Sequence, residues 1–246
     1  MRPATCRLLA LDFADLDVVA SAQWIADRPA DAPFGYVVTP NADHLVRLSR
    51  DPSLLPLYRG AILCLLDSRV VARTARMLGL RAPAVSTGSD LTGRLLSAHL
   101  APGERVTIIG LRPAYLADLV ARTGIAPPAH YDPPMGFDRD PVEMERTVQF
   151  VLDHPARFVF LAVGSPRQER LAAAIVASGK AGGTGLCIGA SLEFLAGAVA
   201  RAPLVMQRAG IEWLHRMLSD PRRLARRYLL DNPPIFGLLL RERFSR

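Results

Sequence analysis

The part of the chain that decides the fold runs from Gly35 to Asp67 and reads GYVVTPNADHLVRLSRDPSLLPLYRGAILCLLD. It opens with a short apolar run that is followed by Thr39, continues through a helical segment, and closes with a second apolar run over residues 61–66. Short apolar runs bounded by turn-forming residues are typical of strands buried on both faces. Two such strands joined by a helix predict a parallel β-α-β unit.

Three polar side chains follow the two predicted strands. Thr39 and Asn41 come after the first strand, and Asp67 comes directly after the second. The carboxyl ends of parallel strands lie at one edge of the sheet, which is where α/β proteins bind ligands. We therefore expect Thr39, Asn41 and Asp67 to open onto one crevice that suits a polar substrate. The same residue types are also ordinary turn and N-cap residues, and taken singly each residue fits that interpretation equally well.

The rest of the first 200 residues alternates between short apolar runs and helical segments. Further strands are predicted at 105–109, 125–131, 158–163 and 186–188, with a weakly alternating one at 7–13. This pattern predicts an α/β fold with a parallel Rossmann-like sheet and helices on both faces. Neither G-x-G-x-x-G after a strand nor G-x-x-x-x-G-K-[ST] occurs, which argues against the two commonest nucleotide-binding fingerprints.

Two glycines at predicted strand ends are candidate substrate-binding positions. Gly110 has no side chain, so a phosphate or another backbone could approach it closely. Gly164 opens the sequence GSPRQE, and a helix is predicted to follow it. The first turn of that helix would present unpaired backbone N–H groups to a phosphate.

Composition predicts one large domain, or one domain with an appendage, in a chain of 246 residues. No apolar run approaches the ~20 residues that a membrane span needs, and no signal-peptide core follows Met1, so a cytoplasmic protein is predicted. The three cysteines are far apart and lie in apolar runs, which predicts buried thiols rather than a zinc site. We expect neither a metal nor a cofactor.

The positive charge is concentrated at the C-terminal end. Residues 1–200 carry 20 Lys and Arg against 19 Asp and Glu, whereas residues 201–246 carry 10 Arg against 4 acidic residues. The last segment also holds the apolar run 235–240. We therefore divide the chain into an α/β core, 1–200, and a basic amphipathic appendage, 201–246, that docks on an anionic membrane surface. The alternative is a pair of C-terminal helices packed on the core.

Short motifs spread over nearly the whole chain occur in a fixed order. They are TPNADH (39–44), the strand-end Asp67, TGSDL (87–91), PPMGF (133–137), GSPRQE (164–169), GASLEFLAG (189–197), and RAPLVMQRAGIEWLHR (201–216) with PRRLARRY (221–228). Each motif is common alone, but the ordered set resembles the WecG/TagA/CpsF glycosyltransferases, glycosyltransferase family twenty-six.

The resemblance implies an inverting hexosyltransferase of exopolysaccharide or cell-surface polysaccharide biosynthesis. Such enzymes move a sugar from a UDP-sugar onto a polyprenyl-diphosphate-linked saccharide, at the cytosolic face of the bacterial plasma membrane and without a metal. The C-terminal appendage of these enzymes docks on the membrane and closes the active site. Some relatives self-associate, which leaves a homo-oligomer open.

Roles follow from the resemblance residue by residue. Asp67 matches the proposed general base, which would take the proton of the acceptor hydroxyl as its oxygen attacks the anomeric carbon. Four other residues match donor- or substrate-contacting positions of the family: Thr39, Asn41, Gln168 and Glu193. At the position of Glu193 many relatives have Asp. Three appendage arginines match residues proposed to hold diphosphate, namely Arg216, Arg223 and Arg226.

The chain departs from the family pattern at two places. Ser68 follows Asp67 where many relatives have Gly. Ala84-Val85-Ser86 occupies the stretch where many relatives have a donor-site arginine. The donor sugar therefore stays open, and a hexose is as consistent with the sequence as N-acetylmannosamine.

Two other functions remain as alternatives. One is a non-catalytic module that binds a membrane or a nucleic acid through the basic tail. The confinement of the basic excess to one segment with an apolar patch argues against nucleic acid. The other is a UDP-sugar epimerase or hydrolase that uses the same crevice.

Overall fold

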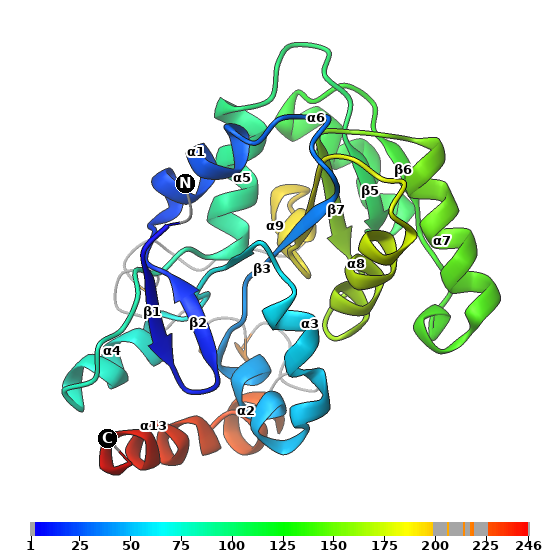
Figure 1. Ribbon diagram of the computed structural model, residues 1–246. Helices are drawn as coiled ribbons and strands as arrows, with labels where there is room; N and C mark the ends of the chain where they lie inside the picture. Colours follow the sequence, from blue (N-terminus) through cyan, green and yellow to red (C-terminus); the bar gives the residue numbers. More distant parts are fainter. Residues whose placement is uncertain (1–2, 199–205, 207–213, 215–216, 219–225, 246) are drawn as a thin grey trace.

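The computed structural model describes residues 3–198, 206, 214, 217–218 and 226–245, and Figure 1 shows it as a sheet between two groups of helices. Six parallel strands form the sheet in the order β4-β3-β8-β7-β5-β6. They are β3 (Gly35–Val38), β4 (Leu63–Cys64), β5 (Thr107–Gly110), β6 (Ala129–Tyr131), β7 (Phe158–Ala162) and β8 (Thr184–Cys187). The predicted parallel α/β fold is confirmed.

The β-α-β unit predicted for residues 35–67 is present. β3 and β4 pair in parallel, with Val37 opposite Leu63 and Val38 opposite Cys64. The connection is made by α2 (Ala42–Arg50), the 3-10 turn η1 (Pro52–Leu54) and α3 (Leu55–Arg59). The second strand, Leu63–Cys64, is shorter than the apolar run that encodes it. Beyond Cys64 the Leu65 N–H still donates to the Val38 carbonyl at 2.9 Å, and Leu66 forms a single bridge with Val85 on its other side.

Helices cover both faces of the sheet. One face carries α1 (Val18–Ala26), α5 (Gly88–Ala98), α6 (Leu116–Thr123) and α9 (Ser191–Leu195). The other face carries α2 and α3 together with α7 (Pro141–Asp153) and α8 (Arg167–Ser178), and α4 (Arg69–Met77) packs into the same core. Short 3-10 turns, η2 (Pro113–Tyr115) and η3 (Phe137–Arg139), complete this part of the chain.

The two cores follow from strand alternation. In β3, Tyr36 and Val38 point into one core and Val37 points into the other. The chain leaves β3 and β7 toward helices on one face, and β5 and β8 toward helices on the opposite face. Divergence of this kind opens a crevice at the carboxyl edge of the sheet.

The prediction of one strand at residues 7–13 is wrong. The structure has two strands there, β1 (Thr5–Leu8) and β2 (Leu11–Ala14), paired as an antiparallel hairpin outside the main sheet. The two-residue turn puts Leu9 at φ 55°. Such turns usually carry Gly, Asn or Asp, so the Leu-Ala sequence gives no turn signal.

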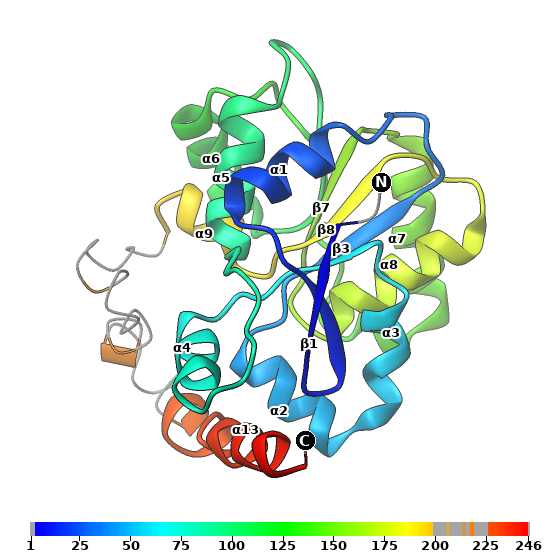
Figure 2. The same cartoon turned by 60° about the vertical axis from the view of Figure 1, so that its left-hand side comes forward.

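The last helix, α13 (Pro234–Phe244), packs on α2 and α4, and Figures 1 and 2 both show it beside these helices at one end of the molecule. A short π-helical segment, η4 (Arg227–Asp231), precedes it. Ile235 and Leu239 are buried in the main core, whereas Phe236, Leu240 and Phe244 are exposed. The apolar run 235–240 thus divides between the core and the surface. Among the residues that the structure describes, no helix combines the length and apolar character needed to cross a membrane.

Candidate functional site

All seven candidate residues of the core lie at or just beyond the carboxyl ends of the strands. Since the strands are parallel, these ends share one edge of the sheet. Thr39 and Asn41 follow β3, Asp67 follows β4, Gly110 ends β5, Gly164 and Gln168 follow β7, and Glu193 lies in α9 after β8. The catalytic and binding roles of these residues stay predictions.

Three polar side chains from three strand ends converge on Gly88, the first residue of α5. A Cβ atom placed on Gly88 would lie 3.1 Å from Thr39 Oγ1, 3.3 Å from Ser191 Oγ and 3.6 Å from Asp67 Oδ2. The missing side chain of Gly88 therefore lets two hydroxyls and a carboxylate gather beside the first turn of α5. This convergence brings Thr39 and Asp67 together, as the sequence predicts.

The two hydroxyl groups are oriented by backbone carbonyls at the end of β8. Thr39 Oγ1 donates to the Cys187 carbonyl at 3.2 Å, and Ser191 Oγ donates to the Ile188 carbonyl at 2.6 Å. The Asp67 N–H donates to the Pro40 carbonyl at 3.0 Å, which ties the end of β4 to the end of β3. Fixed oxygen atoms beside a carboxylate suit the binding of hydroxyl-bearing substrates and the removal of a hydroxyl proton.

Asn41 has a structural role that the sequence left open as an alternative. It is the N-cap of α2, and its Oδ1 accepts hydrogen bonds from the backbone N–H groups of Asp43 and His44 at 3.0 and 3.3 Å. The cap uses the side-chain oxygen. A substrate contact by Asn41 would therefore come from its Nδ2 group.

Gln168 is buried, with 2% of its surface exposed. Its Oε1 accepts the Gly189 N–H at 2.9 Å, and its Nε2 donates to Glu169 Oε1 at 2.9 Å. Both ends of the amide thus bind other parts of the protein, and Gln168 links the first turn of α8 to the loop after β8. Glu169, for which no role is predicted from the sequence, is fully buried.

The two candidate glycines have different surroundings. A Cβ on Gly110 would lie 2.8 Å from the Ala162 carbonyl carbon, and the residue has φ +86°. The close approach that Gly110 permits is therefore made by the backbone at the end of β7. Gly164 also has positive φ, +77°, and the atom nearest its Cβ position is Arg167 Nη2 at 3.3 Å.

The remaining candidates lie on α9 and in the appendage. Glu193 is partly exposed in the first turn of α9. Arg226 is exposed, whereas Arg216 and Arg223 lie outside the described residues. Of the three arginines predicted to bind diphosphate, the structure therefore describes only Arg226.

Both departures from the family pattern have a local structural account. Ser68 caps α4, because its side chain accepts the Val71 N–H at 3.2 Å. In the stretch without the arginine, Val85 bridges to Leu66 beside the site. A different cation lies nearby, since Arg69 is 3.4 Å from Asp90, which accepts the Thr87 hydroxyl.

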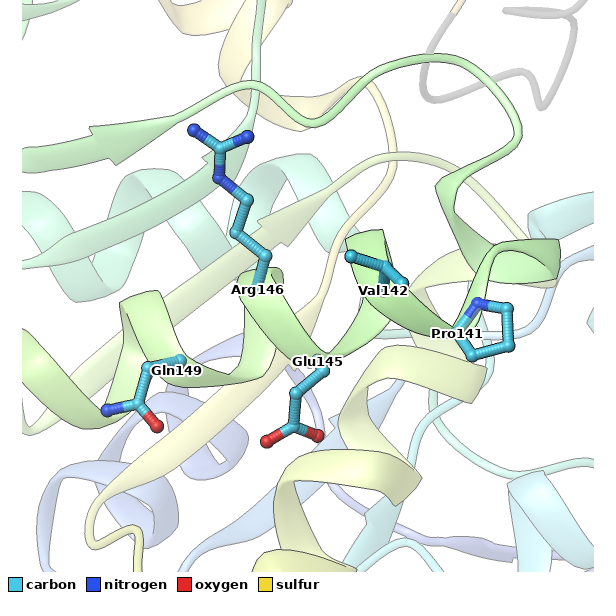
Figure 3. Close-up of a pocket in the computed structure, with 5 residues that line it drawn as sticks. All are labelled: Pro141, Val142, Glu145, Arg146 and Gln149. Carbon is cyan, nitrogen blue, oxygen red and sulfur yellow. The ribbon is translucent and has the colours of Figure 1, made fainter.

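A hollow of about 530 Å³ lies on the outer surface of α7, away from these residues. Figure 3 shows its lining side chains, which all come from that one helix: Pro141, Val142, Glu145, Arg146 and Gln149. None of the candidate residues lines it. The strand-end cluster around Gly88, with its fixed hydroxyls and carboxylate, is therefore the better candidate for chemistry.

The comparison with protein families agrees with the motif order. The model described as "Glycosyl transferase WecG/TagA/CpsF family" matches residues 6–246. The match spans the strand-end residues and continues through α13 to the end of the chain.

Proposed function

Because the chain belongs to the WecG/TagA/CpsF family of glycosyltransferases, we propose that it transfers a sugar from a UDP-sugar to a polyprenyl-diphosphate-linked saccharide. The family places it in polysaccharide biosynthesis. The proposed location is the cytoplasmic face of the membrane, where a lipid-linked acceptor would be reached. The single observation that carries the proposal is the convergence of Asp67, Thr39 and Ser191 beside Gly88.

In the proposed mechanism the acceptor hydroxyl lies against the Asp67 carboxylate. Its proton passes to Asp67 as its oxygen bonds to the anomeric carbon, and the bond from that carbon to UDP breaks with inversion. Thr39 and Ser191 are proposed to orient the donor sugar through its hydroxyls. The leaving diphosphate needs positive charge, for which the appendage arginines, Arg226 among them, are the candidates.

The test is a screen of radiolabelled UDP-sugars with a polyprenyl-diphosphate-linked acceptor in the presence of membranes. Label that enters the lipid fraction identifies the donor and supports transfer. Free sugar or an epimer released without acceptor would instead indicate a hydrolase or an epimerase. Binding of vesicles or DNA without turnover of any donor would favour a non-catalytic module.

The outer face of α13 supports the proposed docking on an anionic membrane. Phe236, Leu240 and Phe244 are 45%, 44% and 85% exposed and are spaced four residues apart, so they share one side of the helix. Arg241 and Arg243 lie in the last turn of the same helix. An exposed apolar stripe beside basic residues suits an anionic lipid surface.

We expect the double substitution Phe236→Ser with Leu240→Ser to weaken binding to anionic vesicles by ~10-fold or more, because it removes apolar contact with the lipid. Thermal unfolding should change less than vesicle binding, since nearly half of each residue is exposed and neither belongs to the buried core. Vesicle sedimentation and a melting curve measure the two effects.

The control is Val142→Ser, which removes a 73% exposed apolar side chain from α7 instead. Equal loss of vesicle binding in both proteins, or none in the α13 variant, would remove α13 from the docking surface.

A further inference from the structure

Glu169 is a buried carboxyl group that is hydrogen-bonded to Gln168, one of the candidate site residues. None of its surface is exposed, and no hydrogen bond of normal geometry reaches its Oε2 among the described residues, although the Ser165 hydroxyl is near enough to lower the pKa of the carboxyl. Its Oε1 accepts from Gln168 Nε2 at 2.9 Å. A charged carboxylate with one unpaired oxygen is costly in an apolar interior, whereas the protonated acid is tolerated. The site therefore favours the uncharged form.

The hydrogen bonds also define where the proton lies. The Gly189 N–H is a donor, so the atom of Gln168 that faces it must be the amide oxygen. The Gln168 NH₂ group then faces Glu169, and Glu169 Oε1 must act as an acceptor. The proton of the neutral acid consequently resides on Oε2. The hydrogen bonds therefore all run the same way, with Gly189 donating to Gln168 and Gln168 donating to Glu169.

Burial, against the effect of the neighbouring groups, favours an uncharged Glu169. Burial raises the pKa of its carboxyl above the ordinary value of 4.5, against smaller opposing effects of Gln168, Ser165 and Arg47. Burial is also the largest cause that raises the pKa of the nearby Tyr58 and Cys187, so this part of the core disfavours negative charge in general. Ser165 links the group to the α2 and α3 side, since Arg47 Nη1 donates to its hydroxyl at 3.1 Å and Tyr58 Oη lies 3.0 Å from it.

We propose that Glu169, as an uncharged acid, is a positioning residue for sugar transfer. It holds the Gln168 amide in the orientation that binds Gly189, and thereby fixes the turn from Gly189 into the start of α9, where Ser191 faces Thr39 and Asp67. This inference rests on the proposed transferase function for its catalytic consequence. Its structural part, the fixed turn, does not depend on any substrate.

The first test compares Glu169→Gln with Glu169→Leu by hydrogen exchange and by kinetics. Gln can accept at Oε1 and places an NH₂ group where the protonated oxygen stands, so it reproduces the neutral acid. We expect E169Q to keep slow exchange of the Gly189 amide and near-normal kcat/KM. E169L should speed that exchange and lower kcat/KM by ~10- to 100-fold, the scale of a misplaced contact.

A matched control separates positioning from general loss of stability. Thr147→Val removes another fully buried polar group, whose Oγ1 donates to the Glu143 carbonyl within α7, far from that turn. Thr147→Val should leave Gly189 exchange and activity unchanged at temperatures where it is folded. Normal Gly189 exchange in E169L, or fast exchange in a folded E169Q, would overturn the proposal.

The second test needs no substrate and remains informative if E169L does not fold. The folded wild type keeps a proton on Glu169 that the unfolded chain releases above about pH 4.5. Its unfolding free energy should therefore fall relative to that of E169Q as pH rises from 4.5 toward the folded-state pKa. The titratable or charged groups around Glu169 that both proteins share are Arg47 on α2, Tyr58 on α3, Tyr36 on β3, Cys187 on β8, and the Arg170–Asp138 pair between α8 and η3.

If the difference in unfolding free energy between the wild type and E169Q stays constant over that pH range, Glu169 is ionised in the folded protein. That result would overturn the proposal. A pH-dependent difference, together with slow Gly189 exchange in E169Q and fast exchange in E169L, in a protein that transfers no sugar would support the positioning role and refute only the transferase function. The two failures are thus distinguishable.

Discussion

Replacing Asp67 by Asn is expected to reduce sugar transfer by ~10²-fold or more, the scale of a lost general base. Asn has nearly the same shape as Asp, so the contacts beside Gly88 should persist. It cannot take up the acceptor proton, because an amide is not basic at neutral pH. The fold and the affinity for the UDP-sugar should therefore stay close to wild type, which melting curves and donor titration can check.

The matched control for Asp67→Asn is Asp132→Asn, which removes one negative charge from an exposed loop after β6 at the same edge of the sheet. That variant should transfer sugar at the wild-type rate. Full activity in Asp67→Asn would exclude Asp67 from proton transfer. Loss of donor binding together with transfer would assign Asp67 to the donor site instead.

Replacing Gly110 by Ala should lower the free energy of unfolding by about 2–4 kcal/mol, the sum expected from an unfavourable backbone and an overpacked contact. Gly110 has φ +86°, and the new methyl group would lie 2.8 Å from the Ala162 carbonyl carbon. Backbone cannot move aside without disturbing the pairing of β5 and β7. The melting temperature should fall by roughly 4–16 °C for a chain of this size.

Gly124→Ala separates the two causes. Gly124 ends α6 with φ +68°, and no atom lies within 4 Å of its Cβ position, so only backbone strain is added there. The Gly124→Ala variant should therefore lose clearly less unfolding free energy than the Gly110→Ala variant. Equal effects at the two glycines would show that the approach of Ala162 contributes nothing. Activity lost from Gly110→Ala without loss of stability would restore the idea that a ligand lies against Gly110.

The sequence predicted the edge of the sheet well because strand ends are local features. Apolar runs followed by Thr39 and Asp67 are enough to place both residues at one edge once the strands are parallel. Ser191 and Gly88 could not be paired with them in advance. Their meeting depends on β8 inserting between β3 and β7, and on the close packing of α5, which are long-range properties of the fold.

The burial of individual side chains could not be predicted from the sequence pattern either. Gln168 and Glu169 read as a polar first turn of a helix, yet both are buried, and one serves to orient the other. In the tail, hydropathy could not separate the inner and outer sides of α13, because both are apolar. Ile235 and Leu239 face the core, while Phe236 and Leu240 face outward.

The packing of α13 fixes the position of Asp67 relative to the outer side of that helix. α13 contacts α2 and α4, and these helices start immediately after Asn41 and Ser68, beside Thr39 and Asp67. A membrane that binds the outer side of α13 would hold Asp67 at a constant height and direction above the lipid headgroups. Acceptors would then be selected by how far their reactive hydroxyl stands from the bilayer, in addition to its chemistry. A lipid-linked saccharide one sugar longer or shorter would present its hydroxyl at the wrong level.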